Sequence, residues 1–145
     1  EAREQARRGH VFNAALLYAD ATELSYRGKN FQLGIFPEIR KEAQALQLPA
    51  ELRGQRPFTW TFGSNAFRVL SASTTAMDGK RKLLIRQQID PGPAAQAERR
   101  NLALIEGFKT AFPEFSEVYG AIVVDAVGPG GERLLRSTEN VQGPR

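Results

Sequence analysis

The sequence contains no cysteine and only one histidine, His10. The absence of cysteine excludes disulfides, thiol nucleophiles and thiolate metal sites within this chain. With a single histidine, zinc clusters and catalytic triads of the usual kinds would need residues from a partner chain. His10 itself lies in a predicted turn, where we expect a capping or surface role. We therefore expect neither a metal nor a cofactor.

The chain also lacks a run of about 18 apolar residues, so we expect no transmembrane segment. It begins with Glu1 and shows no signal peptide, which predicts a soluble protein, either cytoplasmic or exported with its signal removed. A length of 145 residues, with 41% hydrophobic and 25% charged, is typical of one folded domain. The formal net charge of +4 is small and gives only weak support for an acidic partner.

A turn followed by a helix is predicted for residues 9–24. A glycine at the turn suits the positive φ that such a turn often needs, and apolar residues then recur at helical spacing on one face. The pattern resembles the turn and second helix of a tetratricopeptide repeat. The residues that match that family's Gly, Ala, Tyr, Ala and Leu are Gly9, Ala14, Tyr18, Ala21 and Leu24.

This resemblance covers residues 1–24 and implies a helical hairpin that contacts a partner protein around Tyr18 and Leu24. No second repeat follows about 34 residues further on, where Ala43 takes the glycine position and Leu52 the tyrosine position. A lone repeat cannot bury its own apolar face. An ordinary helical hairpin with the same spacing therefore stays open as an alternative.

A second helix is predicted from Pro37 to the residue before Pro49, after a loop over residues 27–34. From Arg56 the apolar period changes from that of a helix to that of a strand. Turn signals, proline and the two periods predict strands at 58–62, 67–75, 80–89, 120–127 and 132–138, with a long helix at 94–112.

The predicted order is α-α-β-β-β-α-β-β, which indicates an α+β fold. An N-terminal helical hairpin (1–48) precedes an antiparallel sheet of about five strands (56–138), with the long helix packed on one face. We expect a single domain over residues 1–145, with a loose tail at 139–145. Cystatin-like and cone-shaped α+β folds have this general look, an analogy that fixes no function.

Aromatic residues alternate on the first two predicted strands, beside an amphipathic helix. This arrangement is typical of a hydrophobic core. The alternative is a pocket for a small apolar ligand, since such pockets are mostly apolar with a few polar groups. The candidate ligand-binding residues are Trp60, Phe62, Phe67, Tyr119 and Asp125.

Asp125 interrupts an apolar strand, and a buried carboxylate needs a partner. We expect it to be exposed or paired with an arginine, and a catalytic role for Asp125 or Tyr119 is the less favoured hypothesis. A basic run, Lys80 to Lys82 with Arg86 four residues later, could contact an anion. We interpret it as a solvated turn that also protects a strand edge. Its residues are Lys80, Arg81, Lys82 and Arg86.

The sequence therefore predicts a non-enzymatic interaction module. We expect it to contact a protein through the helical hairpin or through an open face of the sheet. The alternative is a pocket for a small apolar ligand. Nucleic acid is an unlikely partner, because sheets that bind it usually present exposed aromatic residues, and the aromatic residues here are expected in the core.

Overall fold

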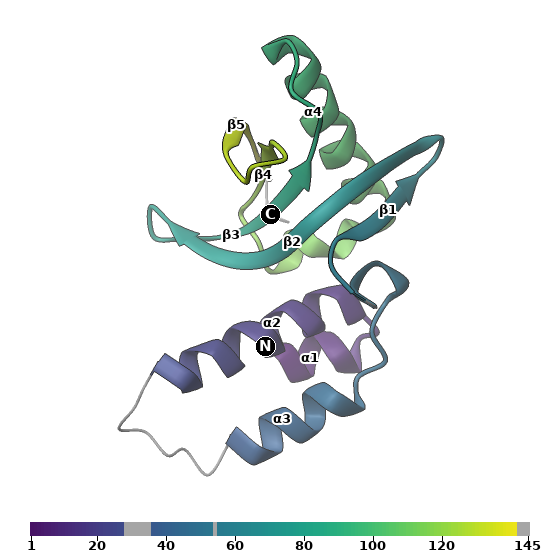
Figure 1. The fold of residues 1–145 in the computed structure, drawn as a ribbon. Helices are drawn as coiled ribbons and strands as arrows, with labels where there is room; N and C mark the ends of the chain where they lie inside the picture. The colour runs from purple at the N-terminus through teal and green to yellow at the C-terminus, as the bar shows by residue number, and fades with distance from the viewer. Residues whose placement is uncertain (28–35, 54, 142–145) are drawn as a thin grey trace. The chain divides into compact units, whose positions relative to one another are not determined.

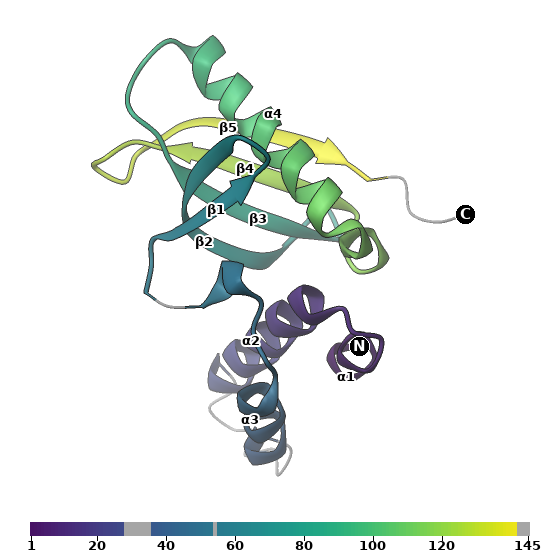
Figure 2. The ribbon, with the colours of Figure 1, turned by 90° about the vertical axis from the view of Figure 1, so that its right-hand side faces the viewer.

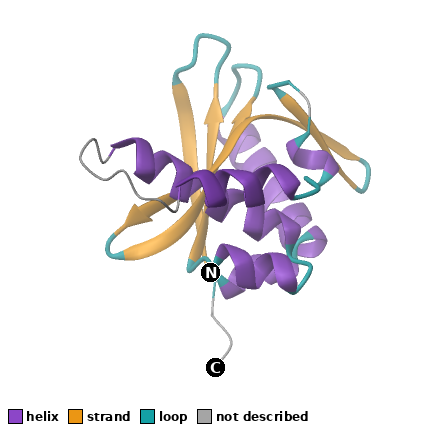
Figure 3. Ribbon diagram, turned by 90° about the horizontal axis from the view of Figure 1, so that it is seen from below, coloured by secondary structure: helices purple, strands orange, loops and turns teal. Residues whose placement is uncertain are grey.

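The computed structural model describes residues 1–27, 36–53 and 55–141 and divides the chain into two compact units. Unit 1 is Glu1–Leu52 and unit 2 is Arg53–Arg145. Helices form unit 1, whereas unit 2 contains the sheet (Figures 1 and 3). The predicted loop residues 28–34 and the tail beyond residue 141 lie outside the described ranges. None of the helices in these ranges combines the length and the apolar composition that crossing a membrane requires.

Unit 1 has the predicted helical pair, preceded by a short helix. Its helices α1, α2 and α3 are followed by one turn of 3₁₀ helix, η1, and α2 packs with both α1 and α3. Their bounds are Ala2–Arg7 for α1, Val11–Arg27 for α2, Phe36–Ala45 for α3 and Ala50–Leu52 for η1.

The turn between α1 and α2 follows from Gly9, whose φ of +80° is accessible to glycine without strain. The N–H of Gly9 donates to the carbonyl of Ala6, and the N–H of His10 donates to the carbonyl of Gln5. These two bonds form a Schellman motif, which satisfies carbonyl groups at the end of α1. His10 thus lies in the turn, as predicted, and α2 begins at Val11.

One carboxylate on α3 joins the three helices of unit 1. Glu42 accepts hydrogen bonds from Nε of Arg3 on α1, at 2.9 and 3.0 Å, and from the hydroxyl of Tyr18 on α2, at 3.0 Å. The bond from Arg3, followed by the bond from Tyr18, lowers the pKa of Glu42 below its ordinary value. Burial and the bond to Glu42 raise the pKa of Tyr18, which is only 6% exposed. The tyrosine of the repeat-like pattern therefore fastens the helices together.

Because the folded-state pKa of Glu42 is lowered, its contribution to stability is present above the unfolded-state pKa of about 4.5 and is lost as the pH falls through the folded value. We expect Glu42→Gln to lower the melting temperature at pH 7, and the difference from wild type to shrink toward pH 3. Thermal unfolding followed by far-ultraviolet circular dichroism measures both effects. Glu38→Gln, on the same helix, is the control, because the exposed side chain of Glu38 makes no hydrogen bond in the described ranges and acts on Arg3 only through its charge. An equal deficit at both pH values would contradict the assignment.

Unit 2 is a five-stranded sheet in the order β1-β2-β3-β4-β5, with helix α4 along one face (Figure 2). Helix η2, a 3₁₀ helix, links α4 to β4. The bounds are Phe58–Phe62 for β1, Asn65–Met77 for β2, Lys80–Gln88 for β3, Ala94–Ala111 for α4, Pro113–Glu117 for η2, Ala121–Val127 for β4 and Arg133–Asn140 for β5.

The predicted turns are confirmed by the backbone. Gly63 has a φ of +60° between β1 and β2, while Asp78 and Gly79 have φ values of +54° and +72° between β2 and β3. Positive φ at both central residues is typical of the type I′ turn, which matches the twist of a hairpin. Aspartate and glycine are among the residues that tolerate this conformation best.

Two predictions about the sheet need correction. Three of its four strand pairs are antiparallel as expected, but β3 and β4 run parallel. The helix between them causes this, because α4 carries the chain back along the sheet before β4 begins. The tail is also shorter than predicted, since Glu139 and Asn140 belong to β5. Glu139 pairs with Ile122 and accepts a hydrogen bond from Lys109 of α4 at 2.7 Å.

The core of unit 2 lies between α4 and the sheet. Trp60 is fully buried and stacks on Phe108 of α4, with 6.0 Å between ring centroids. The buried side chains of Gln87 and Asn101 also meet there, with the amide of Gln87 donating to Oδ1 of Asn101 at 2.7 Å. Nδ2 of Asn101 donates to Oγ of Ser137 on β5 at 3.1 Å. This polar contact fixes the position of α4 over the central strands.

Gly107 lets α4 approach β1 closely. A Cβ atom at this position would lie 2.6 Å from Cβ of Phe62 and 2.8 Å from its Cγ, which is closer than real atoms pack. Cβ of Phe62 is fixed to the backbone, so it cannot swing away. A side chain at position 107 would therefore move the helix or the strand.

We expect Gly107→Ala to lower the free energy of unfolding of unit 2 by about 1–2 kcal/mol, because the overpacking outweighs the better helix propensity of alanine. Denaturant unfolding followed by Trp60 fluorescence measures this, since Trp60 is the only tryptophan and is fully buried. In a Phe62→Gly background, which removes the obstructing Cβ itself, the same substitution should be neutral or stabilising. An equal loss in both backgrounds would mean that Phe62 is not the obstacle.

Candidate functional site

Strands β2 and β3 separate at the end of β3, three residues from the beginning of β2. Their pairing ends at Arg68 and Gln88, just beyond a bulge that bends β2. Residues 65–67 of β2 pair with β1, whereas the N–H of Ile89 donates to the carbonyl of Val127 in line with β4, at 2.9 Å. The two strands thus form a fork at this end of the sheet.

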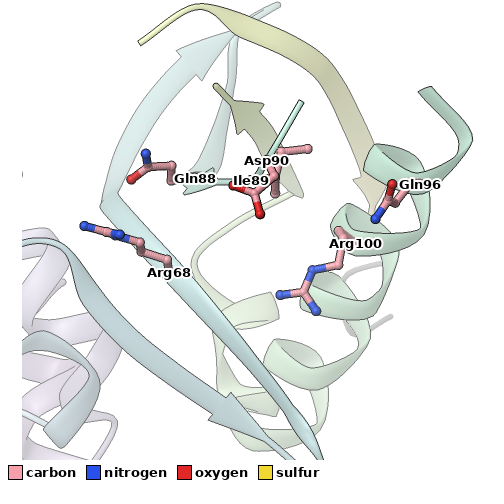
Figure 4. A pocket seen from close by; sticks show the side chains of 6 residues that line it. All are labelled: Arg68, Gln88, Ile89, Asp90, Gln96 and Arg100. Atoms are coloured by element: carbon pink, nitrogen blue, oxygen red, sulfur yellow. The ribbon is translucent and has the colours of Figure 1, made fainter. Parts of the chain in front are cut away.

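A cavity of about 390 Å³ occupies the fork. It is lined from three elements: β2, the end of β3 with the loop that follows, and the first half of α4 (Figure 4). Two guanidinium groups, one carboxylate and two amides surround it, so the lining is mainly polar. The lining residues are Arg68, Gln88, Ile89, Asp90, Gln96 and Arg100.

Arg100 is held in place by two contacts to β2. Its Nη2 donates to the carbonyl of Ala66 at 2.6 Å, and its Cζ lies 4.4 Å from the ring centroid of Phe67. A guanidinium carries five N–H donors, and only this one hydrogen bond from Arg100 is present in the described ranges. The group is therefore oriented by the protein and retains donors for a ligand.

Arg68 lies on the opposite wall of the cavity and has no such anchor. In Figure 4 its side chain runs in the same direction as that of Gln88, away from Arg100. Within the described part of the chain, the side chain of Arg68 forms neither a hydrogen bond nor an ion pair. Its charge adds to the positive potential of the fork without being neutralised by a neighbouring carboxylate.

The aromatic residues predicted to bind a ligand lie outside this cavity. Trp60 and Phe67 are 0% and 1% exposed and pack in the core under α4. Phe62 is half-buried and lines a separate, open hollow of about 520 Å³ between the β1–β2 turn and the second half of α4, with Glu106 and Thr110 opposite. Phe67 contributes to the candidate site only indirectly, because its ring supports the guanidinium of Arg100.

Tyr119 lies on the side of the sheet that faces α4. Its hydroxyl is 2.8 Å from Oγ1 of Thr74, and Thr74 pairs with Leu83 in the ladder between β2 and β3. Leu83 shares its face of β3 with Gln87, which contacts Asn101 of α4. Tyr119 is only 2% exposed, so its hydroxyl serves the packing of the sheet.

Asp125 points to the other face. Ser137 contacts Asn101 of α4, so the preceding residue, Arg136, and its ladder partner Asp125 project away from the helix. Asp125 therefore does not meet Tyr119. It accepts two hydrogen bonds from Arg136, from Nε at 2.7 Å and from Nη2 at 2.9 Å. These bonds also raise the pKa of Arg136 above its ordinary value. The expectation of an arginine partner for Asp125 is confirmed.

The remaining predicted contact residues are also outside the fork. Lys80, Arg81 and Lys82 begin β3, at the end of the strand remote from Gln88, and Nζ of Lys82 lies 3.9 Å from Asp78 of the preceding turn. Arg86 pairs with Asp125 in the ladder between β3 and β4. Of the two hairpin residues, Tyr18 is buried, and the side chain of Leu24 lies outside the described part of the structure.

Sequence reasoning did not identify the cavity in the fork. Arg68 and Arg100 are separated by 32 positions and belong to a strand and a helix. Each reads as an ordinary solvent-facing residue of its own element. The one local signal is the sequence around Asp90, where two prolines stop the strand and would hold a loop in place. Nothing in the sequence shows which strand lies opposite that loop.

Comparison of the chain with protein-family models, with curated proteins and with solved structures gave no match. The resemblance to a tetratricopeptide repeat and the analogy to cystatin-like folds thus stay predictions. Among the described residues, no group of three or more histidine, aspartate or glutamate side chains is placed to hold a metal ion.

The ion pair between Arg136 and Asp125, on the face of the sheet away from α4, allows a stability test. Arg136→Ala would leave Asp125, whose side chain is 6% exposed, without its partner. We expect the free energy of unfolding of unit 2 to fall by about 2 kcal/mol, the cost of removing charged hydrogen bonds from a buried carboxylate. Arg133→Ala on the same strand is the control, because exposed Arg133 forms no ion pair in the described ranges. Equal losses in the two variants, measured by Trp60 fluorescence in denaturant, would contradict the assignment.

Proposed function

We propose that this protein is a non-catalytic binding module and that the fork between β2, β3 and α4 receives a small ligand with an anionic group. The observation that carries the proposal is the fixed guanidinium of Arg100 in a polar cavity. Arg100 is pre-oriented by Ala66 and Phe67, so binding costs little of its side-chain freedom. A guanidinium with unused donors suits a carboxylate or a phosphate oxygen.

The other observations favour binding over catalysis. Asp125 is engaged by Arg136, and Tyr119 lies on the opposite face of the sheet. The two residues considered for acid–base chemistry thus do not share a site. The aromatic residues considered for an apolar pocket divide between the core and a separate hollow. The cavity in the fork has a volume of about 390 Å³, which suits a small ligand, and its lining contains two arginines and one aspartate.

Sodium acetate and inorganic phosphate, titrated at constant ionic strength, provide the test. Constant ionic strength separates specific binding from general screening. We expect saturable shifts in the backbone amide resonances of residues 88–100. Arg100→Gln should weaken binding about tenfold, the effect of losing roughly one charge-assisted hydrogen bond. The affinity of Arg100→Lys should lie between those of the wild type and Arg100→Gln, because lysine keeps the charge but lacks the planar donor group.

The matched control is Arg99→Gln, which removes the same charge from the neighbouring, exposed position of α4 and does not line the cavity. A second variant, Arg68→Gln, tests the opposite wall without touching the contacts that anchor Arg100. Equal weakening by Arg99→Gln would reduce the effect to net charge. Amide shifts that do not saturate, or that map away from residues 88–100, would contradict the proposed site.

A further inference from the structure

The cavity in the fork also carries a negative charge that its own arginines do not neutralise. Asp90 lines the cavity together with Arg68 and Arg100. In the described part of the chain, neither arginine forms an ion pair with Asp90. Figure 4 shows the carboxylate of Asp90 and the guanidinium of Arg100 projecting from the β3–α4 loop and from α4 toward the space beside β2. Charges of both signs thus face one small space without contact between them.

Two prolines restrict the backbone of the loop that carries Asp90. Pro91 follows Asp90 directly and restricts its backbone to extended conformations. Pro93 then caps α4, with a φ of −58°. Gln96 lies against the same loop, since its Oε1 is 2.9 Å from the place that a Cβ on Gly92 would take. The guanidinium of Arg100 is therefore anchored on α4, and the carboxylate of Asp90 projects from a separate, proline-restricted backbone.

This arrangement distinguishes between kinds of ligand. A purely anionic molecule in the fork would place its charge near the carboxylate of Asp90, and a purely cationic one would face the guanidinium of Arg100. A charge that is removed from water needs a partner of opposite sign. The amides of Gln88 and Gln96 can donate or accept, so they tolerate either end of a ligand.

We infer that the ligand of the fork is a zwitterion of the amino-acid or short-peptide class, with its carboxylate on Arg100 and its ammonium group on Asp90. This inference rests on the proposed function of the same site and adds the second charge. A cavity of about 390 Å³ is large enough for a molecule of this size. Only such a ligand gives both unneutralised groups a partner at once.

Glycine, diglycine and triglycine are suitable probes, because they carry the same two charged ends at increasing separation. Each is compared with its N-acetyl form, which is only an anion, and with its C-terminal amide, which is only a cation. The readout is again the amide resonances of residues 88–100 in the full chain. We expect at least one of the three zwitterions to bind about tenfold more tightly than both of its blocked forms.

The variant Asp90→Asn should remove the preference for the zwitterion over the N-acetyl form. Asp78→Asn is the matched control, because it makes the same exchange at an exposed turn outside the cavity, where asparagine tolerates the positive φ. Preference that survives in Asp90→Asn would overturn the inference.

The outcomes separate the two proposals. If the N-acetyl forms bind as tightly as the zwitterions, the fork is a plain anion site, so the zwitterion inference fails and the proposed function stands. If the amides bind as tightly as the zwitterions, the assignment of the carboxylate to Arg100 fails. If neither these probes nor acetate and phosphate bind, the proposed function fails as well.

Discussion

The structure of unit 2 depends on the burial of one face of α4 against the sheet. Trp60 and Phe108 stack at the centre of this contact, while Gln87 and Asn101 fix the helix over the central strands. Because the chain crosses the face of the sheet as α4 before it adds β4, the strand before the helix, β3, and the strand after it, β4, run parallel. The same packing brings the first half of α4 beside the point where β2 and β3 separate.

The candidate site follows from that packing. It joins a bent strand, a proline-held loop and the helix, and no single element contains it. Arg100 illustrates how core and site are connected, since the ring of Phe67 in the core supports the guanidinium at the cavity. Because Ala66 and Phe67 orient this guanidinium in advance, it keeps unused donors for a ligand at the cavity.

In unit 1, as in unit 2, a small number of polar contacts fixes the helices. Glu42 receives bonds from α1 and α2 and thereby connects three short elements. The tyrosine of the repeat-like pattern takes part in this contact, so its spacing serves the packing of helices. That is the role that the alternative of an ordinary helical hairpin assigns to the pattern.

The sequence by itself determined the elements: the α+β class, the helix and strand order, the turns at Gly63 and Gly79, and an arginine partner as one option for Asp125. These are local properties, since apolar period, glycine and proline act within a few residues. The parallel pairing of β3 with β4, the division of the aromatic residues between core and hollow, and the meeting of Arg68, Asp90 and Arg100 were decided only by the tertiary structure. They depend on which elements become neighbours. The burial of whole helix and sheet faces decides this, and residues far apart in the sequence contribute to each face.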